Sequence, residues 1–378
     1  MTTIVLSAGG TGGHLFPAQA LAQELLRRGR RIVVMTDARG RHYDSAFPGA
    51  VIAAVPSASF AGRSLGSRLL APFQILGGIA VGLGKLLRLR PAAVIGFGGY
   101  PSLPVMTAAW LIGFPTIIHE QNAVLGRVNR RLAARVKAVA ASFPLVRFAP
   151  KDSSRVVYTG NPVRAEAARL AGASYVPPAP AGQIRLLVFG GSQGARALSE
   201  IVPAAVALLS SALRERLQIV QQCRSEDIDS VRTAYAAADV KVELASFFDD
   251  LPARMAAAHL VICRSGASTI SELAAIGRPA ILVPYPFATD DHQTANGGVL
   301  TAASAAWCVQ QRDLSAETLA PLLERILNAP EELARRAHGA RSVAKTDAAQ
   351  RLADLVDCIA GVRAAPSVGE NLSAGAVR

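Results

Sequence analysis

The sequence predicts an α/β fold with two doubly wound, Rossmann-like domains, each built on a parallel β-sheet. Apolar segments rich in Val, Ile and Leu alternate with helical patterns along the whole chain, as in parallel sheets that helices cover on both faces. The chain of 378 residues is longer than one hydrophobic core normally serves. One apolar segment in each half runs directly into a glycine turn, at residues 9–13 and 190–194. Such turns let backbone N–H groups approach a ligand at the start of the next helix.

The individual strands are short runs of apolar residues. In the first half they are expected at residues 3–6, 31–35, 51–55, 93–97, 115–119, 136–140 and 156–159. Helical patterns such as 18–28 and 103–112 lie between them. In the second half strands are expected at residues 184–189, 217–222, 241–245, 260–263, 280–283 and 306–309, again alternating with helices.

The domain boundaries follow from the same pattern. We expect an N-terminal domain at residues 1–163, a Pro-rich linker at 164–183 and a C-terminal domain at 184–346. Three prolines and a glycine close together favour the linker, because they continue neither helix nor sheet. Residues 347–363 are expected to form a helix that packs back toward the N-terminal domain. Residues 364–378 are small and polar and are expected to be a disordered tail.

The net charge of +13 is unevenly distributed. Residues 1–160 hold 19 Lys and Arg against 5 Asp and Glu, a net of +14, whereas residues 161–378 hold 21 against 22, a net of −1. One domain is therefore expected to face an anionic partner: nucleic acid, a phosphorylated substrate or an acidic lipid surface. The sequence has no zinc finger, aromatic RNA-binding motif or long basic run, so nucleic acid is the least favoured of the three.

The cysteines and the N-terminus indicate a cytoplasmic protein. The four cysteines lie far apart and form no C-x-x-C motif, which predicts reduced thiols instead of a disulfide framework or a zinc site. The N-terminal residues enter a strand at once, without the basic region and apolar run of a secretory signal.

One segment of the first half departs from the pattern. Residues 69–84 are nearly uncharged and rich in Leu, Ile, Val and Gly, and Lys85, Arg88 and Arg90 follow them. The segment is short and glycine-rich for a bilayer span. It is either a loop and crossover helix on the sheet, or an apolar patch with a basic rim that lies on an anionic membrane surface. The sequence leaves both interpretations open for the region 69–90.

In the first half, candidate site residues follow the strands, because ligands collect at the carboxyl ends of parallel strands. His14 and His119 are both candidates for a general base, since imidazole accepts a proton near neutral pH. Alternatively, His14 caps its turn and His119 only binds backbone at its strand end. Glu120 is one of five acids in a basic half, and either takes part in chemistry or pairs with an arginine.

In the second half, the sequence from Cys263 to Glu272 takes a strand through a small-residue turn into a helix. The hydroxyls of Ser268 and Thr269, with the free N–H groups of the helix start, suit a diphosphate, and Glu272 suits a ribose diol. Alternatively, Thr269 and Glu272 form a capping box without a ligand. Residues 289–296 are rich in groups that suit sugar hydroxyls, although N-capping uses the same residue types.

Two further patterns do not predict a site. Asp227 and Asp229 have the spacing of a metal-binding pair, but they open a helix, where the dipole favours acids. Asp37 stands where a dinucleotide-binding protein has its ribose-binding acid, but the first glycine turn lacks the third glycine of G-x-G-x-x-G.

Six motifs occur in one order and together resemble the MurG family of N-acetylglucosaminyltransferases over about residues 3–360. They are Gly9-Gly10-Thr11-Gly12-Gly13-His14, Gly98-Gly99-Tyr100, His119-Glu120-Gln121-Asn122, Gly160-Asn161-Pro162-Val163-Arg164, Gly190-Gly191-Ser192-Gln193-Gly194-Ala195 and Arg264-Ser265-Gly266-Ala267.

The resemblance implies a GT-B fold, with two domains that face a cleft. It implies an inverting transfer of N-acetylglucosamine from UDP-N-acetylglucosamine to the 4-hydroxyl of undecaprenyl-diphospho-N-acetylmuramoyl-pentapeptide. This step makes a β-1,4 linkage, converts lipid I to lipid II and belongs to peptidoglycan synthesis. The C-terminal domain would bind the donor, and the N-terminal domain the acceptor, at the cytoplasmic face of the bacterial inner membrane. The resemblance also implies that the reaction needs no metal and no cofactor.

The family's site residues carry over to matching positions of this chain. Ser192, Ser268 and Thr269 would contact the diphosphate, next to Ala267, and Glu272 the ribose. Arg164 and the backbone near Phe248 would lie by the uracil, and Gln293, Asn296 and Asn122 would bind the sugar. Thr11, Gly12 and Gly13 would shape the junction of donor and acceptor. His14 would be the base, with His119 and Glu120 as rivals. Two positions depart from the family's pattern: His292 replaces a frequent Gln, and Phe248 an aliphatic residue.

Other functions remain open from the sequence. A UDP-sugar 2-epimerase of similar fold would need no lipid acceptor, and a nucleotide-sugar binding protein would have no turnover. The basic and apolar region 69–90 favours the transferase, since a lipid-linked acceptor calls for a membrane-facing patch.

Overall fold

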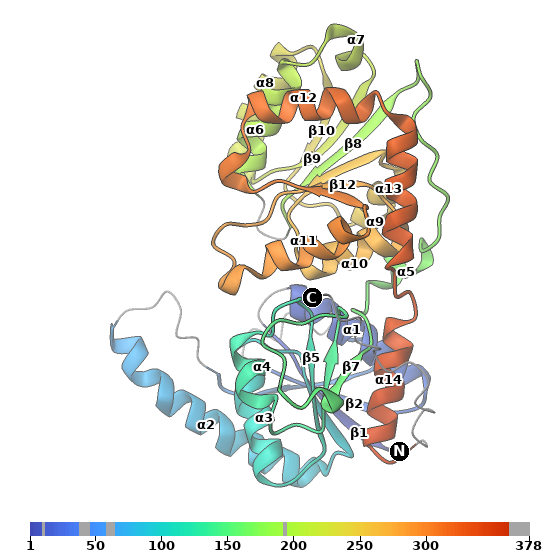
Figure 1. Cartoon of the computed structure of the whole chain (residues 1–378). Helices are drawn as coiled ribbons and strands as arrows, with labels where there is room; N and C mark the ends of the chain where they lie inside the picture. Colours follow the sequence, from blue (N-terminus) through green and yellow to red (C-terminus); the bar gives the residue numbers. More distant parts are fainter. Residues whose placement is uncertain (10–11, 38–45, 58–64, 192–194, 363–378) are drawn as a thin grey trace. The chain divides into compact units, whose positions relative to one another are not determined.

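The computed structural model describes residues 1–9, 12–37, 46–57, 65–191 and 195–362, with the side chains of 65–70 left out (Figure 1). The chain divides into two compact units. Unit 1 comprises Met1–Pro162 and Asp347–Arg378, and unit 2 comprises Val163–Thr346. Thr11, Ser192 and the expected tail at 364–378 lie outside the described residues.

Unit 1 contains a parallel sheet in the order β3-β2-β1-β4-β5-β6-β7. The described strands fall on the expected apolar runs, so those predictions are confirmed. They are β1 (Thr3–Ser7), β2 (Arg31–Thr36), β3 (Val51–Ala54), β4 (Ala93–Gly96), β5 (Thr116–Glu120), β6 (Ala138–Ala141) and β7 (Val156–Tyr158). Strand order reverses beside β1, so the residues after β1, β4 and β5 meet at one edge, where α/β proteins bind ligands.

Helices cover both faces of this sheet, as a parallel sheet requires. One core joins the sheet to α1 (Gly12–Arg27) and α14 (Ala348–Ile359), and the other to α2 (Leu65–Leu89), α3 (Ser102–Leu111) and α4 (Arg127–Leu132). Leu352, Ala353 and Val356 of α14 are buried in the first core. Arg28 adds ion pairs from α1 to Asp354 and Asp357, at 2.8 and 3.1 Å. The C-terminal helix thus belongs to the unit that contains the N-terminus.

The α2 helix combines features of both interpretations of the apolar segment (Figure 1). One face packs on α3: a Cβ at Gly82 would lie 3.3 Å from the Cβ of Ala108, and one at Gly78 would lie 3.0 Å from that of Pro104. On other faces Phe73 and Leu76 are 72% and 62% exposed. Residues Ala71–Leu89 are long and apolar enough to cross a membrane, which by itself is weak evidence because core helices also pass this test.

Unit 2 contains a parallel sheet in the order β10-β9-β8-β11-β12-β13. Its strands also fall on the expected runs: β8 (Ile184–Phe189), β9 (Leu217–Gln222), β10 (Lys241–Ala245), β11 (Leu260–Cys263), β12 (Ala280–Leu282) and β13 (Ala306–Cys308). The main core lies between the sheet and the helices α6 (Arg196–Ala207), α8 (Ile228–Ala237) and α12 (Ala316–Leu327). The remaining helices are α5 (Ala165–Arg169), α7 (Ser211–Arg214), α9 (Leu251–Ala257), α10 (Ala267–Ile276), α11 (His292–Ala302) and α13 (Pro330–Ser342).

The segment expected as a linker, residues 164–183, differs from that expectation. It contains α5 and packs within unit 2. The buried guanidinium of Arg278 donates to the carbonyls of Ala173 and Ser174, and the hydroxyl of Tyr175 donates to the carbonyl of His259 at 2.9 Å. Because a buried guanidinium needs acceptors, these contacts fix the segment to unit 2. The chain therefore changes units at residues 162–163 and again at 346–347.

Candidate active site

The first glycine turn of unit 1 leads from β1 into α1. A Cβ at Gly9 would lie 2.9 Å from the Cγ of Pro101 and 3.0 Å from the Oγ1 of Thr36, so this position has room only for glycine. Gly12 and Gly13 begin α1, and a Cβ at Gly12 would lie 3.0 Å from the ring of Phe16. The turn therefore brings the chain sharply into the helix that carries His14 in its first turn.

A second glycine turn, after β4, lies against the ring of His14. Gly98 and Gly99 have φ angles of +83° and +74°, a conformation that favours glycine. A Cβ at Gly99 would be 3.4 Å from the Cδ2 of His14. The hydroxyl of Ser102 lies 2.7 Å from the carbonyl oxygen of Gly98 and 2.8 Å from that of Ser7, so it joins this turn to β1. The two turns together define where the imidazole of His14 lies.

The histidine at the end of β5 is placed differently. His119 is fully buried, and its Nε2 lies 3.4 Å from the carbonyl oxygen of Gly160. The pKa of His119 is lowered to about 4, mainly by burial and less by the nearby His14, while the hydrogen bond to Gly160 opposes the shift. A pKa this low makes the ring a weak base at pH 7, and its burial keeps it from contact with solvent. This geometry argues against His119 as the base.

Glu120 binds the loop that follows β5. It is 1% exposed, and its Oε1 accepts hydrogen bonds from the backbone and side-chain amides of Asn122, at 3.0 and 3.1 Å. Its Oε2 accepts from the backbone of Gly126 at 2.8 Å and from Asn129 at 2.9 Å. Four donors surround the carboxylate, so the side chain of Glu120 fixes the conformation of the loop through hydrogen bonds. These four hydrogen bonds explain why an acid stands at this position, and a role of Glu120 in chemistry stays a prediction.

In unit 2, the turn after β11 leads into α10. The N-cap residue is Gly266, which has no side chain to cap the helix, so the expected capping box of Thr269 and Glu272 does not form. Thr269 lies in the first turn of α10. The hydroxyl oxygens of Ser265 and Ser268 are buried and have no hydrogen-bond partner within the described residues. Free N–H groups and spare hydroxyls at a helix N-terminus suit an anion such as a diphosphate.

Glu272 and Arg164 lie together beside this turn. The Nε of Arg164 is 2.7 Å from Oε1 of Glu272, and the Nη2 is 2.7 Å from Oε2. The carboxylate is buried, and each oxygen keeps a lone pair beyond the one that Arg164 uses. The pair thus holds Glu272 in a fixed position in which it still accepts hydrogen bonds from a diol.

Residues in the N-terminal half of α11 contact the loops that follow β11 and β12. Asn296 is fully buried and donates from Nδ2 to the carbonyl of Ser265 at 3.2 Å. The Oε1 of Gln293 accepts from the backbone of Tyr285 at 2.9 Å, and the Nδ1 of His292 lies 2.8 Å from the carbonyl of Thr289. Of these three residues, expected to contact or flank the donor sugar, Asn296 contacts the turn after β11, and Gln293 and His292 contact the loop after β12.

Phe248, between β10 and α9, is buried under Arg254, whose guanidinium carbon lies 4.2 Å from the ring centroid. Arg254 also pairs with Asp250 at 2.7 Å. The ring of Phe248 therefore packs inside the protein. Its backbone is the part that can contact a ligand.

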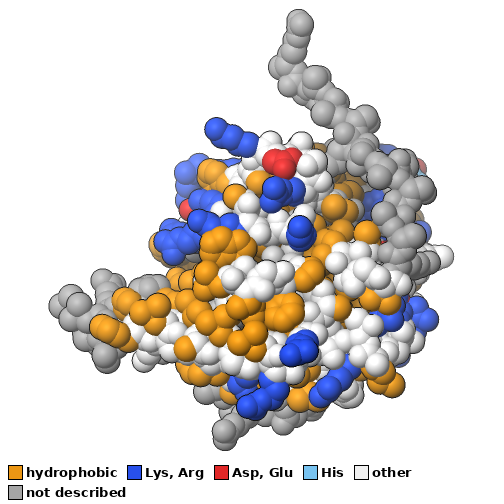
Figure 2. Space-filling model, turned by 90° about the horizontal axis from the view of Figure 1, so that it is seen from below, with side chains coloured by type: hydrophobic (Ala, Val, Ile, Leu, Met, Phe, Trp, Pro, Cys, Tyr) orange, Lys and Arg blue, Asp and Glu red, His pale blue; other side chains and the backbone are white. Residues whose placement is uncertain are grey.

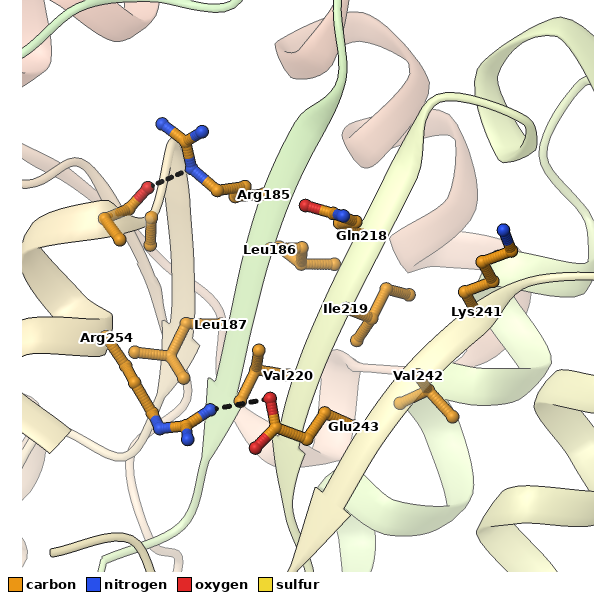
Figure 3. Close-up of a pocket in the computed structure, with 12 residues that line it drawn as sticks. Arg185, Leu186, Leu187, Gln218, Ile219, Val220, Lys241, Val242, Glu243 and Arg254 are labelled. Carbon is orange, nitrogen blue, oxygen red and sulfur yellow. Dashed lines mark hydrogen bonds and ion pairs between the residues drawn. The ribbon is translucent and has the colours of Figure 1, made fainter. Parts of the chain in front are cut away.

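A pocket of about 430 Å³ lies elsewhere in unit 2, on the faces of β8, β9 and β10 that point away from the main core (Figure 3). Its lining includes Arg185, Lys241 and the ion pair of Glu243 with Arg254, at 2.9 Å. The residues predicted for the site are not among the residues that line it. In the described part of the chain, no group of three or more His, Cys, Asp and Glu has metal-binding geometry.

Sequence reasoning did not assign roles to Gln121, Asn129 or Ser265. Gln121 is buried, and its Oε1 lies 3.0 Å from the Nδ1 of His14. Gln121 is part of the motif His119-Glu120-Gln121-Asn122, but its hydrogen-bond partner His14 lies 107 positions earlier in the chain, so no local pattern indicates the contact. Ser265 belongs to the turn after β11, and only the structure shows that its hydroxyl has no hydrogen-bond partner among the described residues.

Comparisons with known proteins place this geometry in a family. Residues 4–141 match the glycosyltransferase family 28 N-terminal domain, and residues 185–352 match the glycosyltransferase family 28 C-terminal domain. The UDP-N-acetylglucosamine--N-acetylmuramyl-(pentapeptide) pyrophosphoryl-undecaprenol N-acetylglucosamine transferase of Paramagnetospirillum magneticum is 51% identical over 354 residues, 93% of this chain and 95% of the relative. The relative of the same name from Chelativorans sp. is 51% identical over 358 residues, 95% of each chain.

Solved structures agree with this assignment. The crystal structure of MurG from Acinetobacter baumannii is similar with a TM-score of 0.76 and 32% identity, over 94% of this chain and 99% of that chain. A putative UDP-N-acetylglucosamine 2-epimerase from Listeria monocytogenes has a TM-score of 0.69 at 15% identity, over 97% of this chain and 98% of that one, and shares the fold alone. Both units thus match their family domains in order, and the chain belongs to glycosyltransferase family 28 with the GT-B fold.

Proposed function

We propose that this protein transfers N-acetylglucosamine from UDP-N-acetylglucosamine to the 4-hydroxyl of undecaprenyl-diphospho-N-acetylmuramoyl-pentapeptide. The reaction inverts the anomeric carbon, forms a β-1,4 linkage and completes lipid II of peptidoglycan. The observation that carries the proposal is the 51% identity, over 93% of the chain, to a transferase named for these substrates. The epimerase alternative rests on a likeness at 15% identity, which supports only the fold.

Unit 2 binds the donor in this proposal. The N-terminus of α10 and the spare hydroxyls of Ser265 and Ser268 support a diphosphate site, which Thr269 and Ser192 extend. Glu272, fixed by Arg164, accepts hydrogen bonds from the ribose hydroxyls. Gln293 and Asn296 bind the sugar from α11, beside His292. The backbone at Phe248 lies by the uracil.

Unit 1 binds the acceptor and supplies the base. His14 takes the proton of the 4-hydroxyl, and that oxygen bonds to the anomeric carbon of the donor while the bond to the UDP oxygen breaks. Thr11, Gly12, Gly13 and Asn122 surround the reacting groups. Negative charge that develops on UDP is stabilised by the α10 N-terminus and its hydroxyls. A metal ion is not needed in this scheme, because these groups take over its electrostatic role.

The acceptor carries a lipid, and we propose that α2 holds unit 1 on the membrane that contains it. Hydrophobic side chains gather on the face seen in Figure 2, with Lys and Arg around them. The exposed apolar side chains of α2 include Phe73, Leu76 and Leu87, and the exposed Arg88 follows Leu87. An apolar patch with basic neighbours binds anionic lipid surfaces. The protein then works as a peripheral protein at the cytoplasmic face of the inner membrane.

Release of UDP from UDP-N-acetylglucosamine tests the reaction. The full chain is assayed with and without a soluble lipid I analogue, each with and without EDTA. We expect release only with the analogue, at the same rate in EDTA, and a product with a β-1,4 linkage. Release that ignores the analogue would contradict the transferase, and a rate lost in EDTA would contradict the metal-free scheme alone.

A further inference from the structure

We propose that Gln121 is a positioning residue that holds His14 in the tautomer and orientation that a general base requires. The inference rests on the proposed function, in which His14 takes the proton of the acceptor hydroxyl. It follows from a chain of hydrogen bonds within unit 1 whose directions are fixed, one after another, by groups that only accept.

The first link is the backbone carbonyl of Gly160. A carbonyl oxygen accepts hydrogen bonds and never donates, so the Nε2 of His119, 3.4 Å away, carries the ring hydrogen, and the Ser142 hydroxyl, 3.5 Å from the same nitrogen, is then an acceptor too. Burial lowers the pKa of His119 to about 4, which keeps the ring neutral at pH 7. A neutral imidazole has one N–H and one lone pair, so the Nδ1 of His119 is an acceptor.

The second link is the side-chain amide of Gln121. Its Nε2 lies 3.0 Å from the Nδ1 of His119 and 3.0 Å from the carbonyl oxygen of Phe97. The backbone carbonyl oxygen of His119, 3.3 Å away, is a third neighbour of this nitrogen, and all three accept. Rotating the amide by 180° would place its oxygen against two carbonyl oxygens, which is unfavourable. The oxygen of Gln121 therefore points the other way.

The third link is His14. The Oε1 of Gln121 lies 3.0 Å from the Nδ1 of His14 and accepts only, so Nδ1 must carry the hydrogen. In the neutral ring the lone pair is then on Nε2, the nitrogen that accepts a proton as base. The carboxylate of a serine protease fixes its histidine by the same logic, and there a wrong tautomer is costly. Here a neutral amide does so, anchored by His119 and Phe97.

The test compares Gln121→Met with wild type in the UDP-release assay. Methionine keeps the length of the side chain and removes both hydrogen-bonding groups. We expect kcat to fall by about 10-fold to 100-fold while the KM for the donor stays within about twofold. Gln23→Met is the matched control, because this exposed glutamine lies on α1 of the same unit, and we expect wild-type kcat for it.

A double variant separates positioning from a general loss of structure. If Gln121 acts through His14, His14→Ala with Gln121→Met is no slower than His14→Ala alone. Losses that multiply would overturn the inference, because they would mean that Gln121 acts independently of His14. Wild-type kcat in Gln121→Met would overturn it as well. Wild-type kcat in His14→Ala would instead contradict the proposed base, so the two failures are distinguishable.

A spectroscopic measurement reads the tautomer itself. In protein with ¹⁵N-labelled histidine, at an alkaline pH where imidazole is neutral, we expect the Nδ1 of His14 to carry the hydrogen in wild type. In Gln121→Met we expect a mixture of both tautomers. A wild-type His14 with the hydrogen on Nε2 would overturn the inference whatever the kinetics show.

Discussion

After β5 in unit 1, Gln121 links two histidines and Glu120 accepts four hydrogen bonds, and of the buried side-chain atoms in this network only the Oδ1 of Asn129 lacks a partner among the described residues. At the start of α10 in unit 2, the hydroxyls of Ser265 and Ser268 are buried without a partner in the described part of the chain. A buried hydroxyl without a partner costs free energy, so such groups call for an explanation. A ligand that supplies the missing partners provides one.

The difference separates two tasks. A base must be held in one orientation before the substrate arrives, and the protein supplies that order through its own hydrogen bonds. A binding site for a diphosphate gains more from groups that remain free to bind it, because each bond to the ligand then replaces no internal bond. We therefore connect the region around His14 with chemistry and the α10 turn with affinity. Three predictions test this comparison.

The largest effect is expected for His14→Ala. Loss of the base should lower kcat by about 100-fold to 10,000-fold, because general base catalysis contributes that much, and leave the KM for the donor nearly unchanged. Steady-state UDP release with the acceptor analogue measures both. His338→Ala, at an exposed histidine of α13, is the control and should behave as wild type. A near-normal kcat in His14→Ala would move the base elsewhere and break the comparison.

A smaller effect, on stability, is expected for Glu120→Gln. The amide replaces an acceptor oxygen by a donor that faces the donors of the loop, so the free energy of unfolding should fall by about 3 kcal/mol. Denaturant unfolding measures it through the fluorescence of Trp110 in a Trp307→Phe background, since the chain has two tryptophans and Trp110 is in unit 1. Unchanged stability with a rate loss above about 100-fold would identify Glu120 as the base instead.

The smallest effect is the pH dependence that buried His119 gives to unit 1. Its pKa is about 4 in the folded protein, below the ordinary 6.5, so only the unfolded state binds the proton between these values. The free energy of unfolding therefore falls as the pH falls through this window, by about 2 kcal/mol between pH 7 and pH 5. The same tryptophan signal measures it. In His119→Gln this contribution should disappear, and an unchanged slope would show that other groups cause it.

The fold was predictable because its signals are local. Each expected strand is a segment of four to six residues rich in apolar side chains, and glycine turns stand where β1 and β8 end. The segment 164–183 was harder, because prolines mark a break in regular structure but not the unit to which the break belongs. Its place in unit 2 depends on Arg278, which lies 105 positions from Ala173. The glycines of the segment 69–84 were weighed only against a bilayer span, whereas in the structure Gly78 and Gly82 allow close packing of α2 on α3.

The sequence predicted which residues meet at the site better than it predicted what each of them does. The topology alone brings residues after β1, β4 and β5 to one edge, so His14, Gly99 and Gln121 were expected near one another. The roles of His119 and Glu120 depend on their hydrogen-bond partners. Gly160, which binds His119, is 41 positions away, and no local pattern encodes that contact.

Binding of UDP-N-acetylglucosamine to the full chain tests the central claim most directly. Isothermal titration calorimetry compares wild type, Ser268→Ala and His14→Ala without acceptor. We expect Ser268→Ala to raise Kd by about 10-fold, since a hydrogen bond to a charged group is lost, and His14→Ala to leave Kd within about twofold. An unchanged Kd in Ser268→Ala, or an equal increase in both variants, would contradict the division between a unit that binds the donor and a unit that performs the chemistry.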